Sequence, residues 1–167
     1  MSRHLSFVKS NRTLRWLFRA PVHLYRCRCG WLLGHRFMLL DHVGRRTGLH
    51  RQTVLEVMEY RTDGPEAIVM CAFGTSADWF RNIEAAPKLD VRIGRRHFAA
   101  TYRILAAEEA TSVVKGYEQR NQLIAPIVRA VLSRLLGWRY DGSERARRRL
   151  VAQLPMIAFR PRGKQPP

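Results

Sequence analysis

The sequence predicts an α+β protein with a mainly β core: a small barrel of about six mostly antiparallel strands, with packed N- and C-terminal helices. Strand-like segments follow one another between residues 36 and 105, with one helical segment among them. After residue 107 the segments are helical, and a short apolar run follows them. Because strands and helices do not alternate, the pattern excludes a doubly wound parallel sheet.

The chain is long and apolar enough for one packed domain, and it is strongly basic. It has 167 residues, 46% of them apolar, and 30 Lys and Arg against 13 Asp and Glu give a formal net charge of +17. This charge predicts an anionic partner: nucleic acid, an anionic membrane surface or a polyanionic small molecule. We expect basic amphipathic helices over 1–34, the barrel domain with its C-terminal helices over 35–160, and a disordered tail over 161–167.

The cysteines and the apolar runs bear on the compartment. Cys27, Cys29 and Cys71 are few and odd in number, and the spacing of the first two does not suit a zinc site. Reduced thiols are therefore expected, as is usual in the cytoplasm. The first residues lack the apolar core of a signal peptide, and the sequence has no apolar run of about 18 residues. The sequence thus predicts a cytoplasmic protein.

Two helices are expected before the first strand. Residues 5–20 carry apolar side chains in a basic setting, which suits an amphipathic helix. This helix either lies on an anionic lipid surface, covers an anionic ligand, or packs on the core with its arginines in solvent. Pro21 suits the first turn of a second helix over 21–29, which Gly30 ends.

The barrel strands are predicted from apolar runs between turn residues. A strand over 36–42 leads into a turn bounded by glycines, and a strand with period-two alternation over 51–60 leaves it. Residues 67–73 are nearly continuously apolar, so this strand is expected to be buried on both faces. A hairpin follows, with strands over 89–93 and 97–105.

Helical segments interrupt and follow these strands. We expect a helix over 77–86, which Ser76 or Asp78 caps and Pro87 ends. The segments expected after residue 107 are helices over 108–121, 123–136 (ended by Gly137) and 143–153 (capped by Ser143), and a closing strand over 156–159.

The turn between the first two strands is the most informative segment, with the sequence GRRTGLHR from Gly44 to Arg51. Glycines near both ends allow a sharp turn in which successive N–H groups converge. Arg45, Arg46 and Arg51 contribute guanidinium groups. Thr47 adds a hydroxyl, so the segment suits a phosphate. An ordinary basic hairpin tip is the alternative interpretation, and the Lys-Ser/Thr pair of a Walker loop is absent.

A second candidate region follows the third predicted strand. Gly74 lets the backbone approach a flat ligand, and the start of the next helix offers free N–H groups. Trp79 and Phe80 supply aromatic walls. Since adjacent helical residues point about 100° apart, one of the two is expected to pack on the sheet instead. Arg81 and Asn82 supply polar contacts.

The sequence contains no recognisable set of catalytic residues. The histidines have no metal-ligand spacing with one another, and Ser76 lacks the G-x-S-x-G context of a nucleophile. Glu56 and Glu59 point to opposite faces of one strand, so they do not form an acid–base pair. The chemistry is therefore expected to come from a bound cofactor.

Short motifs follow one another over roughly seventy residues: LLDHVGRRTG at 39–48, RQTVL at 51–55, AFGT at 72–75, DWFRNI at 78–83 and AAPKLDV at 85–91. Their order and spacing resemble the deazaflavin-dependent nitroreductase family, whose members use coenzyme F420. The resemblance implies a split β-barrel that binds a deazaflavin with a phosphate-bearing oligoglutamate tail. The chain departs from many relatives at Thr75, where they carry Lys, and at Phe80, where they carry Tyr.

The resemblance also implies roles for the matching positions. The arginine-rich turn would meet the phosphate and tail, and the strand after it would run alongside the cofactor. The Gly74 loop would hold the tricyclic ring through backbone groups, and the helix that carries Trp79 would close the site. The expected cofactor-binding residues are Arg45, Arg46, Thr47, Arg51, Gln52, Thr53, Val54, Leu55, Ala72, Phe73, Gly74, Thr75, Asp78, Trp79, Phe80, Arg81 and Asn82.

The expected reaction is hydride transfer between F420 and an unsaturated or otherwise electron-poor small-molecule acceptor. The arginines at 12–19 and 145–149 exceed what one anionic tail needs. They suggest a lipophilic acceptor and a peripheral position on the inner face of a membrane, with solvated helix faces as the alternative. Tyr117 and Tyr140 are candidates for the substrate pocket, and water or Tyr140 is expected to supply the proton.

Two other functions are considered. A split barrel could hold FMN in place of F420, which predicts a yellow protein that a deazaflavin-linked partner does not reduce. A basic nucleic-acid-binding module would stack bases on aromatic side chains beside its arginines, with Trp79, Phe80, Trp138 and Tyr140 as the platform. No RNA-recognition, zinc-finger or helix-turn-helix motif supports the second function.

Overall fold

The computed structural model describes residues 34–86 and 88–163, and within them six strands form a closed barrel. In their order around the barrel, the strands are β1 (Phe37–Val43), β2 (His50–Arg61), β3 (Glu66–Met70), β6 (Met156–Pro161), β5 (Arg96–Ile104) and β4 (Leu89–Ile93). Every neighbouring pair is antiparallel, and β4 pairs with β1 to close the barrel. The predicted α+β fold, a split β-barrel with packed C-terminal helices, is confirmed.

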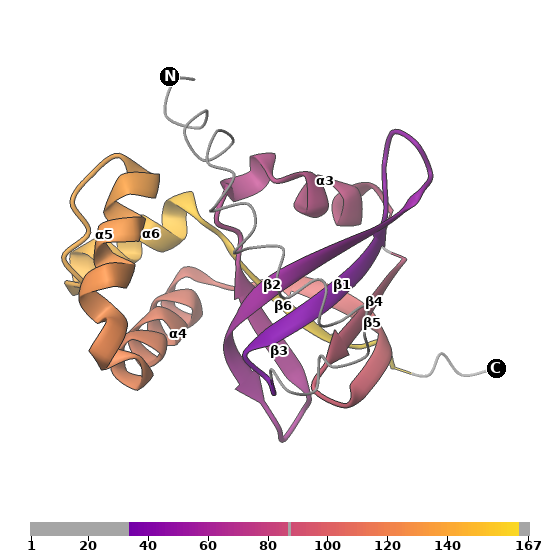
Figure 1. Ribbon diagram of the computed structural model, residues 1–167, viewed down its shortest axis with the longest axis horizontal. Helices are drawn as coiled ribbons and strands as arrows, with labels where there is room; N and C mark the ends of the chain where they lie inside the picture. The colour runs from indigo at the N-terminus through magenta and orange to yellow at the C-terminus, as the bar shows by residue number, and fades with distance from the viewer. Residues whose placement is uncertain (1–33, 87, 164–167) are drawn as a thin grey trace.

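Helices occupy two places around the barrel (Figure 1). One helix, α3 (Asp78–Ala85), lies beside β1, whereas α4 (Ala107–Arg120), α5 (Ala125–Leu136) and α6 (Glu144–Gln153) gather on one side. Gly137 ends α5 in the left-handed conformation, with φ of 74°, and the Ser143 hydroxyl caps α6 by accepting from the Ala146 N–H at 3.2 Å, both as predicted. The helices predicted over 1–34 lie outside the described residues, apart from Gly34 itself.

Apolar side chains form two buried clusters that share β3. Ala67 and Val69 face the cluster inside the barrel, and Ile68 faces the cluster between the barrel and the C-terminal helices. Successive strand residues point to opposite faces, so a strand with core on both sides needs apolar residues at every position. The prediction that this strand is buried on both faces is confirmed.

Two predictions of local structure around α3 were wrong. The third strand ends at Met70 and not at residue 73, because the chain turns there into a short 3-10 helix over Gly74–Ser76. Neither predicted residue caps α3. The Ser76 hydroxyl donates to the Phe73 carbonyl at 2.7 Å, and the Asp78 carboxylate accepts from an arginine of the β1–β2 turn.

Another difference concerns the C-terminal end of the barrel. Arg160 and Pro161 continue β6, opposite Thr101 and Ala100 of β5. The Arg162 N–H donates to the Ala99 carbonyl at 2.8 Å, so backbone pairing extends past the predicted end of the strand at residue 159. The predicted tail over 161–167 therefore begins too early, and residues 164–167 lie outside the described part.

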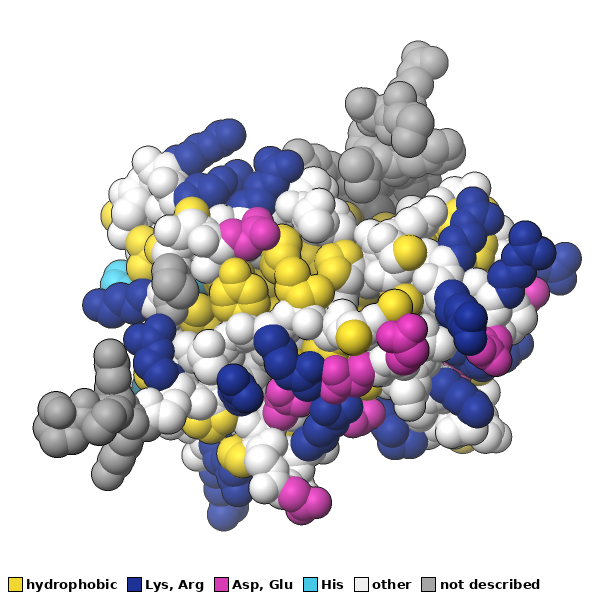
Figure 2. All heavy atoms as spheres, turned by 180° about the vertical axis from the view of Figure 1, so that it is seen from behind, with side chains coloured by type: hydrophobic (Ala, Val, Ile, Leu, Met, Phe, Trp, Pro, Cys, Tyr) yellow, Lys and Arg dark blue, Asp and Glu magenta, His cyan; other side chains and the backbone are white. Residues whose placement is uncertain are grey.

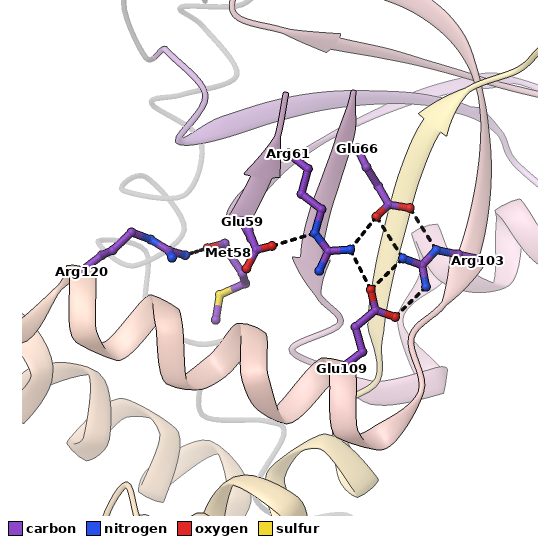
Figure 3. Close-up of polar contacts among 7 residues, drawn as sticks. All are labelled: Met58, Glu59, Arg61, Glu66, Arg103, Glu109 and Arg120. Carbon is purple, nitrogen blue, oxygen red and sulfur yellow. Dashed lines mark hydrogen bonds and ion pairs between the residues drawn. The ribbon is translucent and has the colours of Figure 1, made fainter. Parts of the chain in front are cut away.

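A network of carboxylates and guanidinium groups fixes the start of α4 to the barrel (Figure 3). Arg103 on β5 donates two hydrogen bonds each to Glu66 and Glu109, at 2.7–2.9 Å. Arg61 on β2 donates to the same two carboxylates, at 3.1 and 2.7 Å, and to Glu59 at 2.7 Å. Since Glu109 lies in the first turn of α4, these contacts join that helix to three strands.

The other end of α4 is held against β2. The Arg120 guanidinium donates to the Met58 carbonyl at 2.6 Å (Figure 3), and the Tyr117 hydroxyl donates to Glu56 at 2.8 Å. Burial and the carboxylate beside it raise the pKa of Tyr117 above its usual value. With both ends of α4 tied to the barrel, the second apolar cluster is closed on that side.

The positive charge is distributed over the surface. Figure 2 shows Lys and Arg side chains across the face opposite that of Figure 1, with Asp and Glu beside several of them. An apolar area is exposed on the barrel half of the same face. The structure gives no reason to assign the charge to one continuous nucleic-acid groove on this face.

Candidate functional site

A cavity of about 450 Å³ lies where the turn between β1 and β2 meets α3. Two strand ends, the turn and one helix supply its walls, so residues far apart in the sequence meet here. The residues that line it are His42, Gly44, Arg45, Arg46, Thr47, Arg51, Gln52, Thr53, Asp78, Trp79 and Asn82. All except His42 and Gly44 belong to the set expected from the sequence.

The turn itself needs both of its glycines. The Gly44 N–H donates to the Leu49 carbonyl at 2.9 Å, and the Gly48 N–H donates to the Gly44 carbonyl at 2.8 Å. Gly48 has φ of 66°, in the left-handed region that favours glycine. A side chain at residue 44 would place its Cβ 3.1 Å from Thr47 Oγ1. The predicted tight turn is therefore present, and its geometry aims the following arginines at the cavity and at α3.

Arg45 binds α3. Its Nη1 donates to Asn82 Oδ1 at 2.9 Å and to the Asp78 carbonyl at 3.3 Å, and its Nη2 donates to the Asp78 carboxylate at 3.0 Å. Its backbone N–H also donates to Asn82 Oδ1, at 3.1 Å. This contact lowers the pKa of Asp78 and neutralises the one carboxylate that lines the cavity. Arg45 thus fixes the turn to the helix, and its guanidinium is already paired.

Arg46 and Arg51 differ from Arg45 in this respect. Both side chains are exposed and line the cavity. Neither forms an ion pair or a side-chain hydrogen bond with residues 34–86 or 88–163. Two guanidinium groups are therefore available to an anionic ligand, and no uncompensated carboxylate of the described residues lines the cavity to oppose it.

A chain of hydrogen bonds with a defined direction runs behind the cavity. Because Asn82 Oδ1 accepts from Arg45, the amide nitrogen of Asn82 faces His42 Nδ1, at 3.2 Å, and must donate to it. The other ring nitrogen of His42 then carries the hydrogen and donates to Thr53 Oγ1, at 3.2 Å. The Thr53 hydroxyl accepts this bond, which leaves its own hydrogen free to donate into the cavity.

His42 was not among the site residues expected from the sequence, although the sequence contains a signal for it. Met38, Leu40 and His42 alternate along β1 and share the face that points into the barrel. A histidine on an otherwise apolar inward face must have buried polar partners. His42 is 3% exposed, and Asn82 and Thr53 are those partners.

Burial lowers the pKa of His42 from its usual value of 6.5, against the opposing effect of Asp41 and with a smaller lowering by Arg51. Protonation would also place a hydrogen on Nδ1, opposite the Asn82 donor. Below about pH 6.5 the histidine is protonated in the unfolded chain but still neutral in the folded one. The unfolded chain therefore binds more protons, and we expect the free energy of unfolding to fall as the pH drops below about 6.5. Urea denaturation between pH 8 and pH 5 measures this slope. His42→Gln should remove the slope and His50→Gln, at an exposed position, should keep it; equal slopes in all three proteins would contradict the assignment.

The Gly74 loop of the second expected region, residues 72–75, does not line the cavity. Gly74 is buried with φ of 58°, and a Cβ there would lie 3.2 Å from the carbonyl oxygen of Gln153 at the end of α6. The close packing and the positive φ therefore explain why glycine occupies position 74. The neighbouring Cys71 thiol donates to the Gly74 carbonyl, and burial raises its pKa to about 12. The expected residues after the third strand that do not line the cavity are Ala72, Phe73, Gly74, Thr75, Phe80 and Arg81.

The two adjacent aromatic residues of α3 have different surroundings. Trp79 lines the cavity and is also part of the barrel core, whereas Phe80 is fully buried in that core and does not line the cavity. Arg81 is exposed and donates to the Thr75 carbonyl at 3.2 Å. Val54 and Leu55 on β2 are half-buried and do not line the cavity.

Tyr140 lies in the second apolar cluster, 2% exposed, and does not line the cavity. Its hydroxyl donates to Glu118 at 2.8 Å, and burial together with this carboxylate raises its pKa above the usual value. Glu118 also accepts from Arg147 at 2.7 Å. Glu118 thus joins α4 to α6 through Arg147, and Tyr140 binds the same carboxylate at a distance from the cavity.

Two further features bear on function. Among the described residues, no group of three or more His, Cys, Asp or Glu side chains is placed to hold a metal ion. Within the same part of the chain, no helix has the length and apolarity needed to cross a bilayer.

Comparison with known proteins places the cavity within a matched segment. A family model described as F420H(2)-dependent quinone reductase matches residues 17–122, which include every residue that lines the cavity. Among solved structures, the chain is similar to an F420-H2 dependent reductase, FDR-A, with 17% identity over 75% of this chain and 95% of that chain and a TM-score of 0.46.

Two other solved structures are similar to the barrel. A protein of unknown function from Agrobacterium tumefaciens has 12% identity over 87% of this chain and 56% of that chain, with a TM-score of 0.50. A pyridoxamine 5′-phosphate oxidase-related, FMN-binding protein from Nostoc punctiforme has 16% identity over 85% of this chain and 78% of that chain, with a TM-score of 0.43. At such identities, a structural likeness concerns the fold alone.

Proposed function

The chain belongs to the F420H2-dependent quinone reductase family, and on this premise we propose that the cavity beside α3 holds the anionic part of its cofactor and that a quinone accepts the hydride. The protein is an F420-dependent oxidoreductase, and coenzyme F420 is its cofactor. The observation that carries the proposal is the pair Arg46 and Arg51, which line the cavity without a partner in the described residues.

The residues around the cavity suit a phosphate-bearing, polycarboxylate tail. Arg46 and Arg51 offer planar donors that fit phosphate and carboxylate oxygens. The hydroxyls of Thr47 and Thr53 add neutral donors, the second directed by His42 and Asn82. A net charge of +17 raises the local concentration of such an anion near the protein. Charge and donor direction therefore support the same class of ligand.

When bound in its reduced form, the deazaflavin supplies a hydride to the acceptor. The protein's part is to bind and orient. In this proposal Arg46, Arg51 and Thr53 bind the tail. Arg45 fixes the turn to α3, and Trp79 adds an apolar wall beside the tail. The side chain of Trp79 is 9% exposed, so its position is fixed by the core beneath it. A quinone would be a lipophilic, electron-poor acceptor of the kind expected from the sequence.

Two measurements test the proposal. Titration of the protein with oxidised F420, followed by the cofactor's fluorescence, should give saturable binding that added FMN does not displace. Mixing the protein with reduced F420 and a water-soluble naphthoquinone should then oxidise the cofactor. Binding of FMN in preference to F420 would overturn the cofactor site, and binding without quinone-dependent oxidation would overturn the acceptor alone.

The directed hydrogen bond of Thr53 gives a sharper prediction. Thr53→Val keeps the shape of the side chain but removes the donor, so we expect F420 affinity to fall about fivefold to tenfold, the effect of one hydrogen bond. Thr53→Ser keeps the hydroxyl and should stay within about twofold of the wild type. The same fluorescence titration measures both. Equal losses in the two variants would show that packing at this position, and not the hydroxyl, affects binding.

A further inference from the structure

One helix of the described part has an apolar face that nothing in that part covers. In α5 no residue is buried, although most of its side chains are apolar. Ile127 and Val131 are 65% and 60% exposed, and Leu123 in the preceding turn is 98% exposed. Residues four apart lie on the same side of a helix, so Ile127 and Val131 form an apolar stripe on α5, preceded by Leu123 in the 3-10 helix over Gln122–Ile124. We name this stripe the outer face of α5.

The opposite side of α5 holds the helix on the protein. Leu132, Leu135 and Leu136 pack, partly buried, against the cluster that α4 and α6 build with the barrel. Figure 1 shows α5 at the edge of the helical layer, on the side away from the barrel. The outer face is therefore directed away from the rest of the described structure, with its orientation fixed by the leucines behind it.

The charge around this face has one sign. The sequence has no Asp or Glu between Glu118 and Asp141, whereas the exposed residues Arg129, Arg134 and Arg139 lie in α5 or just after it. A helix with an exposed apolar stripe and flanking arginines has the composition of helices that lie in the interface of anionic bilayers.

We propose that the outer face of α5 docks this protein on an anionic lipid bilayer. Leu123, Ile127 and Val131 would enter the boundary between headgroups and acyl chains, and the arginines on either side would meet anionic headgroups. The charge complementarity favours lipid over a protein partner, because a stripe of three apolar side chains is too small for the apolar centre of a stable protein interface. The inference goes beyond the reaction proposed above and depends on none of the cavity residues.

A matched pair of variants tests the position of this surface. Ile127→Glu and Ile104→Glu make the same chemical change at exposed isoleucines, 65% and 54% exposed, on α5 and on β5. The full chain is sedimented with vesicles of phosphatidylcholine alone or mixed with phosphatidylglycerol. We expect the wild type to bind the mixed vesicles, Ile127→Glu to bind them about tenfold more weakly, and Ile104→Glu to bind within about twofold of the wild type.

The outcomes separate this inference from its alternatives. Equal binding of the two variants, or loss in Ile104→Glu alone, would overturn it and point to another basic segment. If the wild type bound neither kind of vesicle, a protein partner or a second copy would be the remaining occupant, and the lipid proposal would be rejected. F420 titration of Ile127→Glu should match the wild type. A failure of the cofactor site would therefore appear in that titration and not in the sedimentation.

Discussion

Arg51→Ala is expected to weaken binding of oxidised F420 by about tenfold or more. A charge-assisted hydrogen bond to phosphate contributes roughly 1.5–3 kcal/mol, and about 1.4 kcal/mol corresponds to a factor of ten. Arg51 forms no ion pair or side-chain hydrogen bond with the described residues, so its removal breaks none there, and the loss should appear in affinity and not in stability. Fluorescence titration measures the first quantity and thermal unfolding the second.

Two controls make this prediction specific. Arg96→Ala removes an exposed arginine from β5, outside the cavity, and lowers the net charge equally. A loss of affinity shared by both variants would attribute the effect to overall charge. Raising the salt concentration should weaken binding by the wild type more than by Arg51→Ala, because the wild type makes one more charged contact. Unchanged affinity in Arg51→Ala would remove this residue from the site.

The arginine-rich turn could be predicted because its signals are local. Gly44 and Gly48 specify the turn, and the arginines beside them predict an anion whatever surrounds them. The sequence could not distinguish the roles of the arginines. Arg45 pairs with Asp78 and Asn82, more than thirty residues away, and this pairing depends on how α3 packs against the turn.

The Gly74 region shows the opposite case. A glycine after a buried strand is compatible with close approach of a ligand or of another part of the backbone. Only the tertiary structure brings the end of α6 to Gly74, through a connection of nearly eighty residues. Tyr140 was ambiguous for the same reason, because its neighbour Glu118 on α4 is set by helix packing. Local sequence patterns were thus sufficient to predict the strands and the turn. The contact partners of Gly74 and Tyr140, in contrast, depend on packing between segments far apart in the sequence.

The carboxylate network at the start of α4 supports a prediction about stability. Glu109→Gln removes one of the two carboxylates between Arg61 and Arg103 while keeping the shape of the side chain (Figure 3). Hydrogen bonds to charged groups contribute roughly 1.5–3 kcal/mol, so we expect the free energy of unfolding at pH 7 to fall by about 2 kcal/mol. Urea denaturation measures this free energy.

Glu144→Gln is the matched control. Glu144 also lies in the first turn of a helix and pairs with Arg148, but both side chains are mostly exposed. That variant should lose less than about 1 kcal/mol.

The pH dependence distinguishes loss of the charge from loss of packing. Hydrogen bonds from Arg103, and then from Arg61, lower the pKa of Glu109 from 4.5 to about 2. A carboxylate with a lowered pKa stabilises the folded state above pH 4.5, and this contribution is lost as the pH falls from 4.5 towards 2. The difference in unfolding free energy between the wild type and Glu109→Gln should therefore shrink across this interval. A difference that stayed constant down to pH 2 would mean that the glutamine disturbs the packing of α4, and that the charge of Glu109 contributes little.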